Sequence, residues 1–135
     1  MSPSVRTAFK EIMTEKENNV AEYKKLALQF ANALASRKYA VAYALTSSEF
    51  KKKNSLAEMQ KSCESMLSIY PTQEITHVEI FELEEAMTDW RGKQPEDVGW
   101  VYVSVGNENV VEAVTVVVTK EDEQLKIREV EFGRP

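Results

Sequence analysis

The hydrophobic pattern of this chain changes its period once, near residue 71. Before that point apolar residues recur at helical spacing, as on one face of an amphipathic helix. Beyond it the chain is rich in β-branched and aromatic residues, which favour strands. Helices followed by strands predict an α+β fold, in which N-terminal helices pack on a curved, four-stranded antiparallel sheet.

Three helical segments are predicted before residue 71. The first covers residues 20–36 and the second covers residues 39–45. The third begins at a capping box, in which Ser55 caps the helix and Glu58 reaches back to the Ser55 amide. It ends before Pro71, because a proline disfavours helical backbone in the residue that precedes it. The apolar stripe of the first helix consists of Val20, Tyr23, Ala27, Phe30 and Leu34.

Four strands are predicted beyond it, at residues 75–84, 98–105, 110–119 and 125–132. Tight connections at residues 106–109 and 120–123 make the last three strands an antiparallel meander. In the first and last strands the apolar residues change face midway, which predicts a β-bulge and a bent sheet. Residues 85–97 are the longest irregular stretch, and loops of this length often carry function.

The 135 residues suit one compact domain. Residues 1–18 are an extension or an extra helix, residues 19–70 supply the helices and residues 71–135 supply the sheet. No apolar run approaches the roughly 20 residues needed to span a bilayer, and the first residues lack the apolar stretch of a signal peptide. A cytoplasmic protein with no membrane partner is expected.

The net charge of −5 is unevenly distributed. Residues 1–54 carry +5 and residues 55–135 carry −10. The acidic half repels phosphate backbones, which disfavours nucleic acid as a partner, and it can steer a basic partner. The basic run Lys51-Lys52-Lys53 has no interleaved aromatic residues and is predicted to be a solvated loop.

Cysteine, histidine and glycine are too few for several kinds of site. One cysteine, Cys63, excludes an internal disulfide and a cysteine-based zinc cage. One histidine, His77, excludes a histidine-rich metal site, and the four glycines form no phosphate-binding loop. No metal or cofactor is expected. Cys63 falls on the apolar stripe of the third helix, which predicts a buried, inert thiol.

His77 and Glu79 form one candidate site. In a regular strand they point to the same face, so the Glu79 carboxylate can orient or charge the His77 ring, which then acts as a general base. The structural alternative is a half-exposed strand residue beside a solvated glutamate. His77 is therefore the weak candidate for a catalytic residue.

Aromatic residues form the second candidate site. Trp90 and Arg91 lie in the 85–97 loop, and both residue types are enriched at binding hot spots. Alternatively, the Trp90 indole covers one end of the core. Trp100 and Tyr102 share one face of the second strand. If they face outward, they predict a dimer or partner interface; if they face inward, they line or fill a pocket.

The stretch LALQFANALASRKYAVAYALTSSEFKKK is similar to the opening of the nuclear transport factor 2-like (cystatin-like) superfamily. The resemblance covers roughly residues 20–132 and implies a long helix, a short helix and then a cone-shaped sheet through which many members dimerise. Larger members carry a hairpin between the second and third helices, which has no room here in residues 46–54. The shared pattern is Tyr39-x-x-x-Tyr43-x-Leu45-x-Ser47-x-x-Phe50.

These observations favour a non-enzymatic binding protein that holds another protein, or itself as a homodimer, through the sheet and the 85–97 loop. The resemblance points to the bacterial immunity-type members, which neutralise a cognate toxin. The alternative is a binder of a small hydrophobic ligand, or a pocket enzyme of the isomerase or cyclase kind with His77 as its base. The resemblance carries over no catalytic motif.

Overall fold

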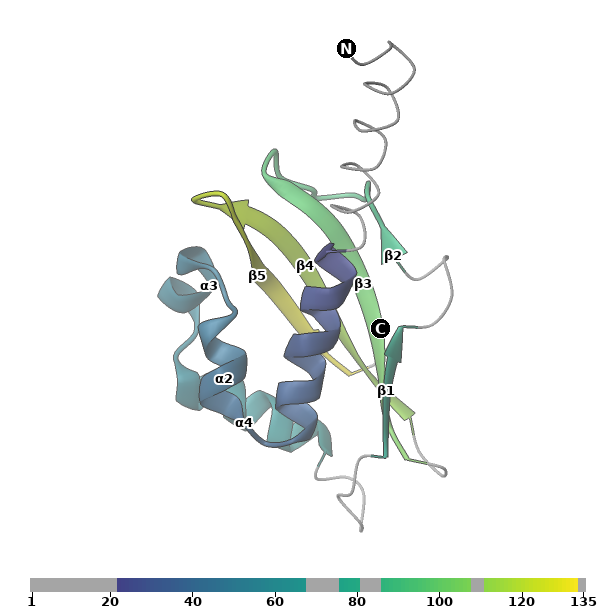
Figure 1. Cartoon of the computed structure of the whole chain (residues 1–135). Coiled ribbons are helices and arrows are strands. Elements are labelled where there is room, and N and C mark those ends of the chain that lie inside the picture. The colour runs from purple at the N-terminus through teal and green to yellow at the C-terminus, as the bar shows by residue number, and fades with distance from the viewer. Residues whose placement is uncertain (1–21, 68–75, 81–85, 108–110, 134–135) are drawn as a thin grey trace, which may run out of the picture.

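The computed structural model describes residues 22–67, 76–80, 86–107 and 111–133 (Figure 1). Within these ranges the helices lie together on one face of an antiparallel sheet, so the predicted α+β class and order of layers are confirmed. The helices are residues 22–35, α2 (Tyr39–Ala44), α3 (Ser48–Lys53) and α4 (Leu56–Leu67). The strands are β1 (His77–Ile80), β2 (Ala86–Met87), β3 (Asp97–Gly106), β4 (Val111–Glu121) and β5 (Gln124–Phe132).

The sheet is four strands wide, in the order β1-β3-β4-β5. The strand β2 pairs with β3 beside Trp100, further along the same edge as β1. The predicted meander of the last three strands is confirmed. Its second turn consists of Asp122 and Glu123, whose φ angles are 50° and 66°, as two-residue hairpins with the right-handed twist of strands require.

Two β-bulges bend the sheet at the same level. In β3, Asp97 pairs with Thr119 and Gly99 with Val118, so Val98 is an extra residue. In β5, Glu129 and Ile127 pair with consecutive residues of β4, so Arg128 is an extra residue. The bulge predicted for the last strand is confirmed. It explains why the apolar residues of this strand change face there. The bulge predicted for the first strand falls partly on residues outside the described ranges.

The core lies between the sheet and the helices. The side chains of Val101, Val103 and Val105 point into it from β3 and are at most 2% exposed. Gly99 continues this row, and the ring of Tyr23 from the 22–35 helix packs directly on its backbone: a methyl group built on Gly99 would lie 2.6 Å from the Tyr23 Cγ. Gly99 therefore lets the helix approach the sheet closely.

The ends of the helices follow local signals. The capping box of α4 is confirmed: the Ser55 amide donates to Glu58 Oε1 over 3.1 Å, and the Glu58 amide donates to Ser55 Oγ over 3.1 Å. The 22–35 helix is followed by Arg37 at φ 59°, and the Lys38 amide donates to the Ala33 carbonyl over 2.8 Å. This geometry satisfies a terminal carbonyl that the helix leaves unpaired.

Two predictions about loops are wrong. The run Lys51–Lys53 is not a loop but the last turn of α3, where its side chains remain exposed. Ser47 caps this helix by accepting from the Phe50 amide over 3.2 Å, buried Phe50 anchors it, and cations at its C-terminus suit the helix dipole. The stretch 85–97 is interrupted by β2 and ends at the start of β3, so the described loop is 88–96.

The outer edge of β5 is partly covered. Between α2 and α3, Ser47 donates its amide to the Ile127 carbonyl over 2.7 Å, and the Ile127 amide donates to the Leu45 carbonyl over 2.9 Å. Covering an edge in this way blocks strand-to-strand aggregation. Among the described residues, no helix is both long enough and apolar enough to cross a membrane. The N-terminal extension 1–18 lies outside the described residues.

Candidate functional site

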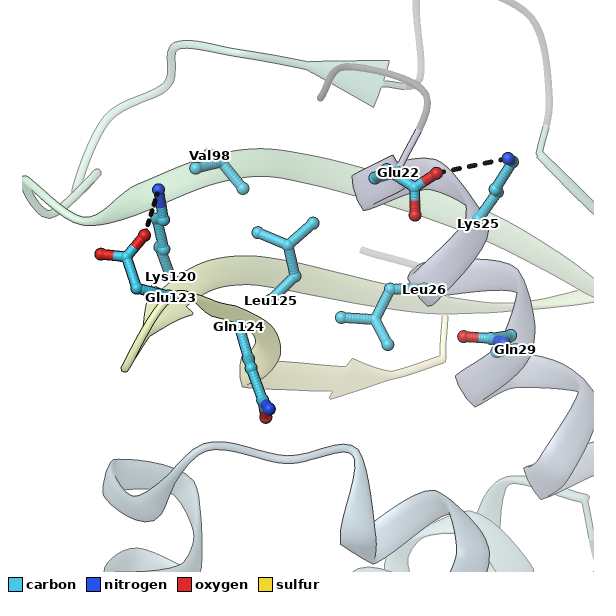
Figure 2. A pocket seen from close by; sticks show the side chains of 9 residues that line it. All are labelled: Glu22, Lys25, Leu26, Gln29, Val98, Lys120, Glu123, Gln124 and Leu125. Atoms are coloured by element: carbon cyan, nitrogen blue, oxygen red, sulfur yellow. Dashed lines mark hydrogen bonds and ion pairs between the residues drawn. The ribbon is translucent and has the colours of Figure 1, made fainter. Parts of the chain in front are cut away.

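A cleft lies between the 22–35 helix and the turn that joins β4 to β5 (Figure 2). Its volume is about 500 Å³. The side chains of Leu26, Val98 and Leu125 project into it and give it an apolar floor. Its rim carries two ion pairs, Lys25–Glu22 at 3.3 Å and Lys120–Glu123 at 3.4 Å. A balanced rim over an apolar floor suits a neutral molecule.

The outer face of the sheet, which is the face turned away from the helices, has a different character. Strand β3 presents Trp100 and Tyr102 there, with ring centroids 6.5 Å apart. The register sets Val117 of β4 and Glu129 of β5 beside Trp100. In the next row it sets Thr115 and Glu131 beside Tyr102. The outer face thus carries an aromatic row and an acidic row, with smaller side chains between them.

The 88–96 loop closes one end of this face. Its Trp90 carbonyl accepts from the Lys93 amide over 3.3 Å, in a turn where Gly92 has φ 92°. Lys93 Nζ lies 5.6 Å from the centre of the Trp90 ring and donates to the Thr88 carbonyl. Together the loop and the strands enclose the outer-face pocket, of about 400 Å³. Its lining includes Trp90, Arg91, Gln94, Trp100, Val117, Arg128, Glu129 and Glu131.

A buried ion pair holds the wall of the outer-face pocket. Arg128 donates from Nε to Asp97 Oδ1 over 2.8 Å and from a terminal nitrogen to Oδ2 over 2.7 Å. The Asp97 side chain is fully buried and that of Arg128 is 9% exposed. Asp97 also accepts from the Gln94 amide over 2.8 Å. This pairing ties the bulge of β5 to the bulge of β3 and to the loop that carries Trp90.

The pKa of Asp97 reflects two opposing influences. Burial alone would raise it, because a carboxylate loses hydration. The hydrogen bonds from Arg128, from the Gln94 amide and from Thr119, together with the charge of Arg128, outweigh that influence and lower the pKa below its ordinary value. Asp97 is therefore ionised near neutral pH and holds Arg128 in a fixed orientation.

The structure brings together three of the residues singled out in the sequence. Trp90, Arg91 and Trp100 all line the outer-face pocket. Tyr102 lies on the same face beside Trp100. Both aromatic residues of β3 face outward, whereas Val101 between them and Val103 after them face the core. The sequence had left this orientation open, and the role of these residues in binding stays a prediction.

His77 and Glu79 lie elsewhere. The register sets His77 opposite Gly106 and Glu79 opposite Ser104, in the strand β1. Their side chains lie outside what the structure describes, so a catalytic role for His77 and a binding role for Glu79 stay predictions. Neither residue belongs to the outer-face pocket as its lining is described.

Sequence reasoning missed four charged residues of the outer-face pocket and its wall. Asp97 and Arg128 are 31 positions apart, so no local spacing joins them. Glu129 and Glu131 alternate with Val130 and Phe132, a pattern that defines two faces of a strand and marks no site. The one available signal was the change of face in the last strand, which places a charged residue, Arg128, at a bulge.

The single cysteine is buried, as predicted. Cys63 is 1% exposed in α4. Burial raises its pKa to about 11, although the Tyr39 hydroxyl and the charge of Arg37 act in the opposite direction. Within the described part of the chain, no three acidic, histidine or cysteine side chains form a group that could hold a metal ion.

Comparisons with protein-family models, with curated proteins and with solved structures found no match to this chain.

Proposed function

We propose that this chain is a non-enzymatic binding protein that holds a protein partner on the outer face of its sheet. The observation that carries the proposal is the outer-face pocket, where Trp90 and Arg91 from the loop lie beside Trp100 from the strand. Tryptophan and arginine are the residue types that dominate binding energy at interfaces. The buried Asp97–Arg128 pair supports the same conclusion, because it fixes the pocket wall before a partner arrives.

We also propose that the chain is a shortened member of the nuclear transport factor 2-like superfamily. The order of its elements supports this: the 22–35 helix, short helices and then an antiparallel sheet bent by bulges. The helix α3 occupies the segment where larger members carry a hairpin. Immunity-type members, which neutralise a cognate toxin, are the precedent for a binding function in this superfamily.

Native mass spectrometry tests the binding proposal. The full chain is isolated gently from its own cells as the wild type, as Trp100→Ala and as Val41→Ala. Val41 is the matched control, because it is an exposed apolar residue, 54% exposed, on the helical side. We expect a second protein at fixed stoichiometry with the wild type and with Val41→Ala, and its loss with Trp100→Ala. Equal recovery from all three would contradict the proposal.

The cleft of Figure 2 favours a second candidate function, the binding of a neutral small molecule over Leu26, Val98 and Leu125. The same spectra distinguish it. A bound small molecule on a chain without a protein partner supports the cleft, and it would persist in the Trp100→Ala variant, because Trp100 does not line the cleft.

A further inference from the structure

The outer face offers a trough with two chemically different walls. Its floor is β4, where Thr115 and Val117 are 6% and 4% exposed. On one side stand the rings of Trp100 and Tyr102, and on the other side stand carboxylates of β5 in the same rows of the register. A side chain that enters between the walls meets an aromatic surface and a negative charge together.

The charges around the trough are not balanced. Arg128 is paired with buried Asp97, and Glu129 lies 3.8 Å from the same guanidinium with its side chain 64% exposed. Glu131 forms no ion pair with any described residue and is exposed. Arg91 also lines this pocket, and none of the described carboxylates forms an ion pair with it. Among the described lining residues, two exposed carboxylates therefore accompany one cation, Arg91, that forms no ion pair with a described residue.

The aromatic rings add an attraction for cations. A tryptophan face attracts an ammonium or guanidinium group through its quadrupole. Within the chain Trp90 already has such a partner, because Lys93 Nζ lies 5.6 Å from its ring centre. Over the Trp100 ring, no cation is found among the residues that the structure describes. The trough is thus complementary to a group that is apolar along its stem and positive at its end.

We infer that the partner presents a lysine or arginine side chain, from a basic segment, to the trough between Trp100 and the pair Glu129 and Glu131. This inference rests on the proposed function and names the chemistry of the partner. The stem of the basic side chain lies along the Trp100 ring, its cationic group reaches the carboxylates, and the −10 charge of residues 55–135 steers the basic segment toward the face.

The test uses the two indole N–H signals of the full chain in NMR, since the chain has two tryptophans. The probes are a glycine-rich peptide with lysine and arginine residues and its counterparts with glutamine or glutamate at those positions. We expect the basic peptide alone to move the Trp100 signal, with an affinity that falls as salt is added. Glu129→Gln with Glu131→Gln should weaken binding about fivefold, as expected for two exposed charge pairs.

Two further variants sharpen the test. Glu64→Gln with Asp122→Asn removes the same charge from exposed sites elsewhere and should bind the basic peptide like the wild type. Arg91→Gln removes the competing cation and should strengthen binding of that peptide. Weaker binding of the basic peptide by Arg91→Gln would show that Arg91 holds the peptide and does not compete with its cation, and it would overturn the inference.

The remaining outcomes are also decisive. If no peptide moves the Trp100 signal, or if the glutamate peptide moves it as far as the basic one, the inference is wrong. A shift with protein concentration alone would identify a second copy as the occupant and would likewise overturn it. The proposed function survives these failures if Trp100→Ala still abolishes the complex seen by native mass spectrometry.

Discussion

Arg128 and Asp97 join two β-bulges of one sheet through a pair of hydrogen bonds of 2.8 and 2.7 Å. Each bulge lies opposite the same part of β4, so the ion pair joins the two irregular positions of the sheet. The same carboxylate accepts from the Gln94 amide of the 88–96 loop. The Asp97 carboxylate therefore links both bulges to the loop that carries Trp90 and holds the wall of the outer-face pocket.

Removal of Arg128 should destabilise the fold strongly. In the Arg128→Ala variant the buried Asp97 carboxylate is left without its charged partner, and we expect the free energy of unfolding to fall by about 3 kcal/mol. Urea denaturation of this variant, of Asp97→Ala and of the double variant measures the coupling between the two side chains. A loss below about 1 kcal/mol, the value of an exposed pair, would contradict the account.

The lowered pKa of Asp97 predicts a loss of stability in acid. Since the folded value lies below that of the unfolded chain, about 3.9, the contribution of Asp97 is fully present above that pH and is lost as the pH falls through the folded value. In the Asp97→Asn variant the free energy of unfolding should therefore vary less with pH in this acidic range. The pKa values of Glu58 and Glu121 are lowered by hydrogen bonds from Ser55 and Ser48. These two carboxylates therefore also lower the stability of the fold as the pH falls.

The contact between Gly99 and Tyr23 should tolerate no added atoms. Gly99→Ala places a methyl group inside the space of the Tyr23 ring, and we expect the free energy of unfolding to fall by about 1 to 3 kcal/mol. Thermal and urea denaturation measure this loss. Tyr23→Leu combined with Gly99→Ala should cost less than the sum of the single variants. Additive losses would show that the ring does not press on Gly99.

Cys63 should be unreactive in the folded protein. The thiol is buried, and its pKa of about 11 leaves little thiolate at mildly alkaline pH. We expect a chromogenic disulfide reagent to label it at the rate of global unfolding and at once in denaturant. Fast labelling without denaturant would show that the core around α4 opens independently of the rest.

Features with a local cause could be predicted from the sequence. The capping box of Ser55 and Glu58 needs only neighbouring residues, and the change of face after Ile127 marks a bulge whatever the strand pairs with. The outward position of Trp100 and Tyr102 could not be predicted, because alternation defines two faces without saying which one the helices cover.

Features with a distant cause could not be predicted. The pair Asp97–Arg128 exists only because β4 brings β3 and β5 to the same level. The helix α3 was not predicted, because the run Lys51–Lys53 is typical of a solvated loop. The capping residue Ser47 and the apolar Phe50 were the features that favoured a helix. The short strand β2 has only two residues, Ala86 and Met87, and gains its strand character from pairing with β3.

Site-specific photocrosslinking in the cells of origin tests the central claim most directly. A crosslinking residue replaces Gln94, at the rim of the outer-face pocket, and in a matched variant it replaces exposed Ala57 on the helix α4. We predict one protein adduct of defined mass from position 94 that disappears when Trp100→Ala is added, and none from position 57. The same adduct from both positions, or an adduct from position 94 that persists in the Trp100→Ala background, would contradict the account.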